Sequence, residues 1–131
     1  MIAGIHELGY VHRDIALRNI LVGLDNKVLL IDFEFCTKVQ NDSNKSYCGA
    51  RETASDSVLE KLQAKQDVCV QPLDDLISLS RAIHLYVTNT RVPIKDKAHW
   101  PGEVLEFWSV ECRRGYIPKE LKYRECAKEL S

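Results

Sequence analysis

Apolar and polar positions along the first third of the chain predict a short helix followed by small β elements. Residues 1–8 place apolar side chains on one helical face, and Gly9 then supplies the left-handed conformation that ends many helices. Residues 10–11 predict a brief strand. The apolar runs 20–22 and 28–31 are separated by residues with turn chemistry, which predicts a small β-hairpin.

The rest of the chain predicts mainly helices. Residues 36–57 are rich in Ser, Asn, Asp and Thr and predict a long loop, which in a compact domain is usually functional or mobile. A short helix is then expected over 58–66, and a long helix opens at Pro72. This long helix is apolar on most sides and should be central and buried, with apolar positions at Leu76, Ile77, Leu79, Ile83, Leu85 and Val87. A loop over 88–102 and two more helices, over 103–112 and from Pro118 onward, complete the expected elements. The predicted fold class is α+β, mainly α.

The composition is that of an ordinary folded domain. The chain has 131 residues, of which 45% are apolar and 28% charged, and its net charge is −1. This length predicts one domain or part of one. The balanced charge gives no general attraction to nucleic acid or to an anionic membrane, and no apolar run is long enough to span a bilayer. The five cysteines are odd in number and show no CxxC spacing, which argues against a zinc cluster or a disulfide framework. A reducing compartment fits best, so we expect a cytoplasmic or nuclear protein.

Four polar residues near the predicted hairpin carry the candidate chemistry: Asp14, Arg18, Asn19 and Asp32. Asp14 and Asn19 flank one short loop, and Asn19 and Asp32 end neighbouring strands, so two carboxylates and an amide oxygen can converge on one point. Hard oxygen ligands of this kind suit Mg²⁺. A carboxylate that does not bind metal can orient an attacking hydroxyl or accept its proton. Phosphoryl transfer needs these same parts.

The stretches HRDIALRN and IDFE resemble the catalytic loop and the metal-binding loop of protein kinases. The resemblance implies that Asp14 is the catalytic carboxylate, that Asn19 binds a second Mg²⁺ and that Asp32 is the main Mg²⁺ ligand. It also implies ATP as the cofactor and a protein hydroxyl as the acceptor. Arg18 matches the loop form of tyrosine kinases, in which it helps to neutralise the transferring phosphoryl group.

Other positions are implied by the same resemblance to be structural. His12 and Arg13 would pack against the metal loop and contact the activation segment, and Phe33 would be a packing residue. The stretch DDLISLS resembles the central buried helix of the kinase C-lobe. Its Asp75 would hydrogen-bond the backbone of the His-Arg-Asp turn.

The match covers about residues 1–90 and lacks several kinase features. The stretch CGARETASDSVLEKL resembles a degenerate end of an activation segment, in which Gly49 is kept but Ser55-Asp56-Ser57 stands where Ala-Pro-Glu is usual. There is no G-x-G-x-x-G and no strand lysine for phosphate, and the first helix resembles the tail of a longer element. Residues 1–131 are therefore predicted to be a partial kinase-like domain, a C-lobe without its N-lobe. Such a lobe is a fragment, a truncated product, or a unit that works with a separate N-lobe segment.

Glu34 stands where protein kinases have glycine after Asp-Phe. Glycine permits backbone conformations that a side chain resists, so one interpretation is a damaged site, a pseudokinase that serves as a protein interaction module. Small-molecule kinases of the choline/ethanolamine and aminoglycoside phosphotransferase type commonly carry Asp-Phe-Glu or Asp-Trp-Glu, which is a second interpretation. Their catalytic loop usually lacks the arginine that this chain has at Arg13. The predicted function is an ATP- and Mg²⁺-dependent protein kinase-like phosphotransferase, truncated or inactive as an isolated chain, with these two alternatives left open.

Overall fold

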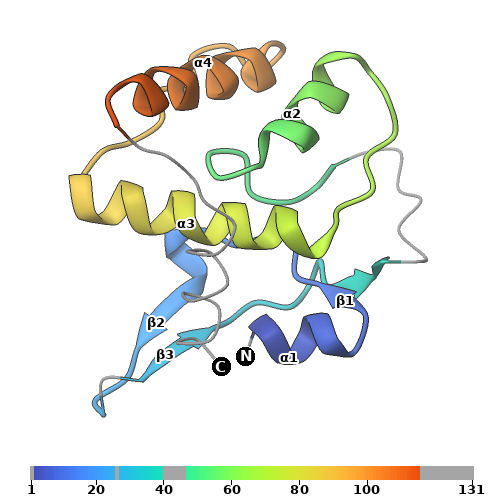
Figure 1. Ribbon diagram of the computed structural model, residues 1–131, viewed down its shortest axis with the longest axis vertical. Helices are drawn as coiled ribbons and strands as arrows, with labels where there is room; N and C mark the ends of the chain where they lie inside the picture. Colours follow the sequence, from blue (N-terminus) through green and yellow to red (C-terminus); the bar gives the residue numbers. More distant parts are fainter. Residues whose placement is uncertain (1, 26, 40–46, 116–131) are drawn as a thin grey trace.

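The computed structural model describes residues 2–25, 27–39 and 47–115 (Figure 1). Within these ranges the elements are α1 (Ile2–Glu7), β1 (Tyr10–Val11), the 3₁₀ turn η1 (Leu17–Asn19), β2 (Ile20–Val22), β3 (Val28–Leu30), β4 (Thr37–Lys38), α2 (Asp56–Gln63), α3 (Pro72–Thr88) and α4 (Trp100–Arg113). The predicted mixture of helices with small sheets is confirmed. Helix α3 crosses the middle of the molecule, with α2 and α4 on one side and α1 and the β2–β3 hairpin on the other (Figure 1).

The predicted hairpin is present as an antiparallel pair of β2 and β3, in which Ile20 faces Leu30 and Val22 faces Val28. Its second strand ends at Leu30, one residue earlier than expected. A second antiparallel pair joins β1 to β4. Strand β4 lies inside the segment that was predicted to be loop. It was not predicted because two residues are too few to produce an alternating pattern.

Two helices begin earlier than the apolar pattern indicates. Helix α2 starts at Asp56 because the Ser55 hydroxyl caps it, accepting a hydrogen bond from the N–H of Val58 at 3.2 Å. Helix α4 starts at Trp100 with Pro101 in its first turn, where a missing N–H has no cost. The loop expected over 88–102 is shorter for this reason. The helix expected from Pro118 onward lies outside the described residues.

Helix α3 is central, but the prediction that its apolar residues are all buried is wrong. Leu76, Leu79 and Leu85 are buried, whereas the exposed fractions of Ile83 and Val87 are 38% and 74%. Buried positions recur every three or four residues along one face, as helix geometry requires, and that face also carries polar residues. Ile83 follows Leu79 by four residues on the same side of the helix and Val87 follows one turn later, so they are exposed where this side of α3 is no longer covered.

The buried apolar residues form two clusters that meet at α3. One lies under α2 and α4 and includes Leu85 and Trp108. The other lies under α1 and the hairpin and includes Ile15, Leu76 and Leu79. The segment between β1 and β2 is therefore held against the middle of the molecule. In the part of the chain that the structure covers, no helix combines the length and apolarity needed to cross a membrane.

Candidate functional site

The loop between β1 and β2 is hydrogen-bonded to Asp75 of α3. This carboxylate is 1% exposed, and it accepts the backbone N–H of His12 at 2.7 Å and that of Arg13 at 3.0 Å. The Nε2 atom of His6 on α1 lies 2.9 Å from the same carboxylate. A buried carboxylate needs such partners to offset its lost hydration. Asp75 thus joins α1, the loop and α3, and it makes the backbone hydrogen bonds that the sequence analysis expected of it.

His12 links this loop to the segment after β3. The ring is fully buried, and its Nδ1 atom accepts the backbone N–H of Asp14 at 3.1 Å. Because a backbone N–H can only donate, the ring proton is on Nε2, which donates to the carbonyl of Ile31 at 3.1 Å. The same ring packs edge-to-face against Phe33 at a centroid distance of 5.0 Å. His12 therefore fixes the positions of Asp14 and of the Ile31–Phe33 backbone relative to each other.

Arg13 connects the loop to the segment that precedes α2. Its backbone is left-handed, with φ 73°, and its Nε donates to the carbonyl of Phe35 at 2.6 Å. Its own carbonyl accepts the N–H of Ala50 at 3.3 Å. A Cβ atom added to Gly49 would lie 1.9 Å from that carbonyl oxygen. Glycine is therefore required at position 49 by the close approach of the two backbones.

Burial raises the pKa of two groups beside this contact. The Tyr47 hydroxyl donates to the carbonyl of Ala50 at 2.6 Å, and burial, reinforced by the charge of Asp75, raises its pKa far above the ordinary value. Burial and then the charge of Asp75 raise the pKa of the Cys36 thiol, partly opposed by the charge of Arg13. Both groups are thereby kept in their neutral forms near neutral pH.

Asp14, Arg18 and Asn19 form one connected group. Asp14 is 5% exposed, and its Oδ1 lies 2.7 Å from Nη2 of Arg18. Its Oδ2 accepts a hydrogen bond from Nδ2 of the buried Asn19 at 2.9 Å, and the same nitrogen donates to the Asp14 carbonyl at 2.7 Å. Because the amide nitrogen of Asn19 is used in this way, its oxygen is the atom suited to bind a cation.

Asp32 lies next to this group through its backbone rather than its side chain. The N–H of Ile31 donates to the carbonyl of Asn19 at 2.8 Å. Asp32 itself is left-handed, with φ 61°, and exposed, and its Oδ1 accepts the N–H of Glu34 at 3.3 Å. Over the described ranges, no hydrogen bond or ion pair joins its carboxylate to Asp14 or Asn19. The described residues also contain no cluster of three His, Cys, Asp or Glu side chains that could hold a metal ion. A metal bound by Asp32 would therefore need the amide oxygen of Asn19 as a second ligand.

Glu52 was not among the site residues predicted from the sequence. Its Oε1 lies 2.7 Å from Nη1 of Arg18, so Arg18 bridges two carboxylates. The backbone around Glu52 is itself fixed, because its carbonyl accepts Nε1–H of Trp108 at 2.8 Å and the neighbouring Thr53 hydroxyl donates to the carbonyl of Ile15 at 2.6 Å. These contacts join distant segments, and no local motif signals them.

The residues Ser55-Asp56-Ser57, which stand where Ala-Pro-Glu is usual, lie at the start of α2 and make side-chain contacts with α3. The Ser55 hydroxyl donates to Asp74 at 2.6 Å, and Asp56 pairs with the buried Arg81 at 2.7 Å. The guanidinium of Arg81 also donates to the carbonyl of Ala54 and lies over the Trp108 ring at 4.8 Å. The departure from Ala-Pro-Glu is therefore accompanied by a local set of polar contacts.

A family model described as protein tyrosine and serine/threonine kinase matches residues 2–66. Residues 2–66 therefore carry part of a protein-kinase-like domain. The matched region contains the loop of His12 to Asn19, Asp32, and the segment of Glu52 to Asp56. Helix α3, which supplies Asp75 to this kinase-like part, lies beyond the match.

Curated relatives of this kinase-like domain are serine/threonine-protein kinases. The protein named ste20 from Aspergillus fumigatus is 44% identical over 41 residues, which are 31% of this chain and 5% of that protein. The one named pakA from Talaromyces marneffei is 42% identical over 41 residues, 31% of this chain and 6% of that protein. LATS2 from Mus musculus is 41% identical over 46 residues, 35% of this chain and 4% of that protein. The aligned segments are thus a small part of each relative.

Proposed function

We propose that residues 1–131 form the C-terminal lobe of a protein kinase-like phosphotransferase that uses ATP and Mg²⁺ to phosphorylate a protein hydroxyl. The observation that carries the proposal is the group in which Asp14 is bonded to both Arg18 and Asn19, one backbone hydrogen bond away from the strand end that carries Asp32. The match of residues 2–66 to the protein tyrosine and serine/threonine kinase model adds support.

In this proposal each residue has a separate task. Asp14 orients the acceptor hydroxyl and takes its proton, since its carboxylate is held in place by two partners. Arg18 neutralises developing negative charge. Asn19 and Asp32 supply an amide oxygen and an exposed carboxylate, which are hard donors of the kind that Mg²⁺ binds in small number. The metal, when bound, would screen the charge of the ATP phosphates.

We propose that a separate nucleotide-covering lobe packs on the β2–β3 hairpin. Four apolar side chains of the hairpin are exposed, with exposed fractions from 43% to 109%: Leu21, Val22, Leu24 and Leu29. Leu21 and Leu29 are cross-strand partners and share one side of the hairpin, and an exposed apolar pair of this kind suits an interaction surface.

A pseudokinase is the second candidate. It is favoured by Glu34, which adds a negative charge two residues from Asp32, and by the engagement of both carboxylate oxygens of Asp14 within the chain. In this case the same lobe binds a protein partner without transferring phosphate.

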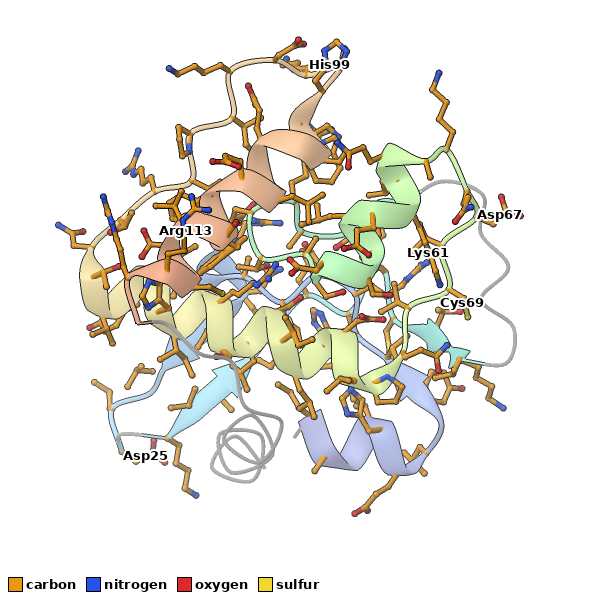
Figure 2. All side chains as sticks on the ribbon, turned by 45° about the horizontal axis from the view of Figure 1, so that its top comes forward. Asp25, Lys61, Asp67, Cys69, His99 and Arg113 are labelled. Atoms are coloured by element: carbon orange, nitrogen blue, oxygen red, sulfur yellow. The ribbon has the colours of Figure 1, made fainter. Side chains whose placement is uncertain are left out.

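A thermal-shift titration with ATP and Mg²⁺ separates the two candidates. The proposed function predicts a rise in Tm with ATP that requires Mg²⁺, and loss of that requirement in Asp32→Asn. Asp67→Asn is the matched control, because Asp67 is an exposed carboxylate on the loop after α2, away from the hairpin turn marked by Asp25 (Figure 2). No shift at millimolar nucleotide would favour the pseudokinase. Glu34→Gly should raise phosphotransfer if the site is damaged, whereas a fall would favour a small-molecule-kinase-like site.

A further inference from the structure

A cleft of about 290 Å³ opens beside the Asp14–Arg18 pair. Its walls come from four parts of the chain: η1, the segment before α2, the end of α3 and the loop that follows α3. The apolar part of its lining is Leu17, Leu85, Val92 and Ile94. A ligand that reaches Asp14 from this side would therefore pass over Arg18 and along an aliphatic surface.

The charged residues of the cleft differ in how far they are already paired. Arg18 is paired with Asp14 and with Glu52, each at 2.7 Å, so its charge is already used within the chain. Arg91 is exposed, and within the described ranges its side chain has no ion pair and no hydrogen bond. Arg91 is therefore the cation of the cleft that is available to a ligand.

The loop that carries Arg91 is positive as a whole. Residues 89–99 contain Arg91, Lys95 and Lys97 against a single acid, Asp96, which is bonded to His99 at 2.6 Å. Arg91 also lines a larger neighbouring cleft of about 750 Å³, together with Lys95. Glu103 in that cleft accepts the backbone N–H of Lys95 at 2.9 Å, so this acid is used within the chain. Glu106, Glu111 and Arg114 also line this larger cleft, so the excess of positive charge is confined to the loop of residues 89–99.

We propose that the cleft binds the peptide segment that carries the acceptor hydroxyl, and that it prefers acidic side chains in that segment. The inference rests on the proposed function, because it takes Asp14 as the place where the hydroxyl lies. The acidic side chains lie over Arg91, and the aliphatic parts of the peptide contact Leu17 and Val92. An exposed charge pair changes affinity by about two- to fivefold, and Debye screening should weaken the preference as salt is raised.

The test is fluorescence anisotropy of the full chain with three labelled peptides, whose Ser and Tyr acceptors are flanked by Glu, by Gln or by Lys. The Glu peptide should bind tightest to the unchanged chain and the Lys peptide weakest. Arg91→Glu should remove or reverse this order. Lys97→Glu is the matched control, because it makes the same charge change in the same loop at a residue that lines neither cleft. It should leave the order intact.

Several results would overturn the proposal: no discrimination by the unchanged chain, no binding of any peptide, or an equal effect of the two variants, which would show a general charge effect. Both variants are checked for an unchanged Tm, since both replaced residues are exposed. Nucleotide is left out of the binding assay. If the Glu peptide binds tightest and the Lys peptide weakest but ATP and Mg²⁺ do not raise Tm, this inference stands and the proposed phosphotransfer is rejected. If ATP and Mg²⁺ raise Tm but the peptides bind without this order, this inference is rejected and the proposed phosphotransfer stands.

Discussion

The carboxylate of Glu52 lies 2.7 Å from the guanidinium of Arg18, across 34 residues of chain. The guanidinium is about half exposed, with 54% of the side chain accessible, and its other end contacts Asp14. A long side chain in this position would otherwise sample many rotamers. Two carboxylates hold it in one place, so the segment before α2 helps to position the group around Asp14.

Glu52→Gln should release Arg18 while leaving the fold intact. The pair is partly exposed, so the free energy of unfolding should change by less than about 1 kcal/mol. The ¹⁵N signals of the Arg18 guanidinium, separate when rotation is hindered, should merge in the variant. Glu106→Gln is the control, because Glu106 pairs with the exposed Arg113 at 3.8 Å, far from Asp14 in the chain. Arg18 signals that are the same in both variants would refute a positioning role for Glu52.

Gly49→Ala should destabilise the chain by roughly 2–4 kcal/mol, because the added Cβ would overlap the carbonyl oxygen of Arg13. Gly4→Ala makes the same chemical change in α1, where a Cβ meets no atom within 4 Å. It should leave stability unchanged or raise it by about 0.5–1 kcal/mol, since alanine is the better helix former. Urea unfolding measures both. Equal stabilities would show that the two backbones are not in the tight contact described.

Asp75→Asn should cost roughly 2–4 kcal/mol, because one of the two buried N–H groups of His12 and Arg13 loses its charged acceptor. Asp67→Asn removes an exposed carboxylate and should change stability by less than about 0.5 kcal/mol. Amide hydrogen exchange should also rise at His12 and Arg13 in the first variant. A loss of stability without faster exchange at these amides would place the effect elsewhere.

Cys36 should react with iodoacetamide more slowly than Cys48 in the folded chain at pH 8. The raised pKa of Cys36 lowers its thiolate fraction at that pH, and only the thiolate attacks the reagent. Cys36 is also half-buried, whereas Cys48 is exposed. Peptide mass spectrometry gives both rates, and in denaturant they should become similar. Faster labelling of Cys36 in the folded state would contradict the environment described for it.

The loop from His12 to Asn19 could be predicted from the sequence because its residues are close together in the chain. The hairpin was predicted for the same reason. The bridges from Glu52 to Arg18 and from Asp56 to Arg81 join residues 34 and 25 positions apart, so no local pattern indicates them.

Element boundaries were predicted less well where a single residue decides them. The start of α2 depends on the Ser55 cap, and the start of α4 on Pro101. The exposed fractions of Ile83 and Val87 were missed because apolar content alone does not tell how much of a long helix its neighbours cover.

The most direct test of the central claim is an NMR titration of the chain with ATP and Mn²⁺, a paramagnetic substitute for Mg²⁺. If Asn19 and Asp32 hold the metal beside Asp14, the side-chain amide of Asn19 and the backbone amides of Asp32 and Glu34 should broaden first. Asp32→Asn should remove this effect, and Asp67→Asn should not. Broadening that begins at other acidic residues, such as Glu103 and Glu106 of α4, or that is the same in both variants, would contradict the account.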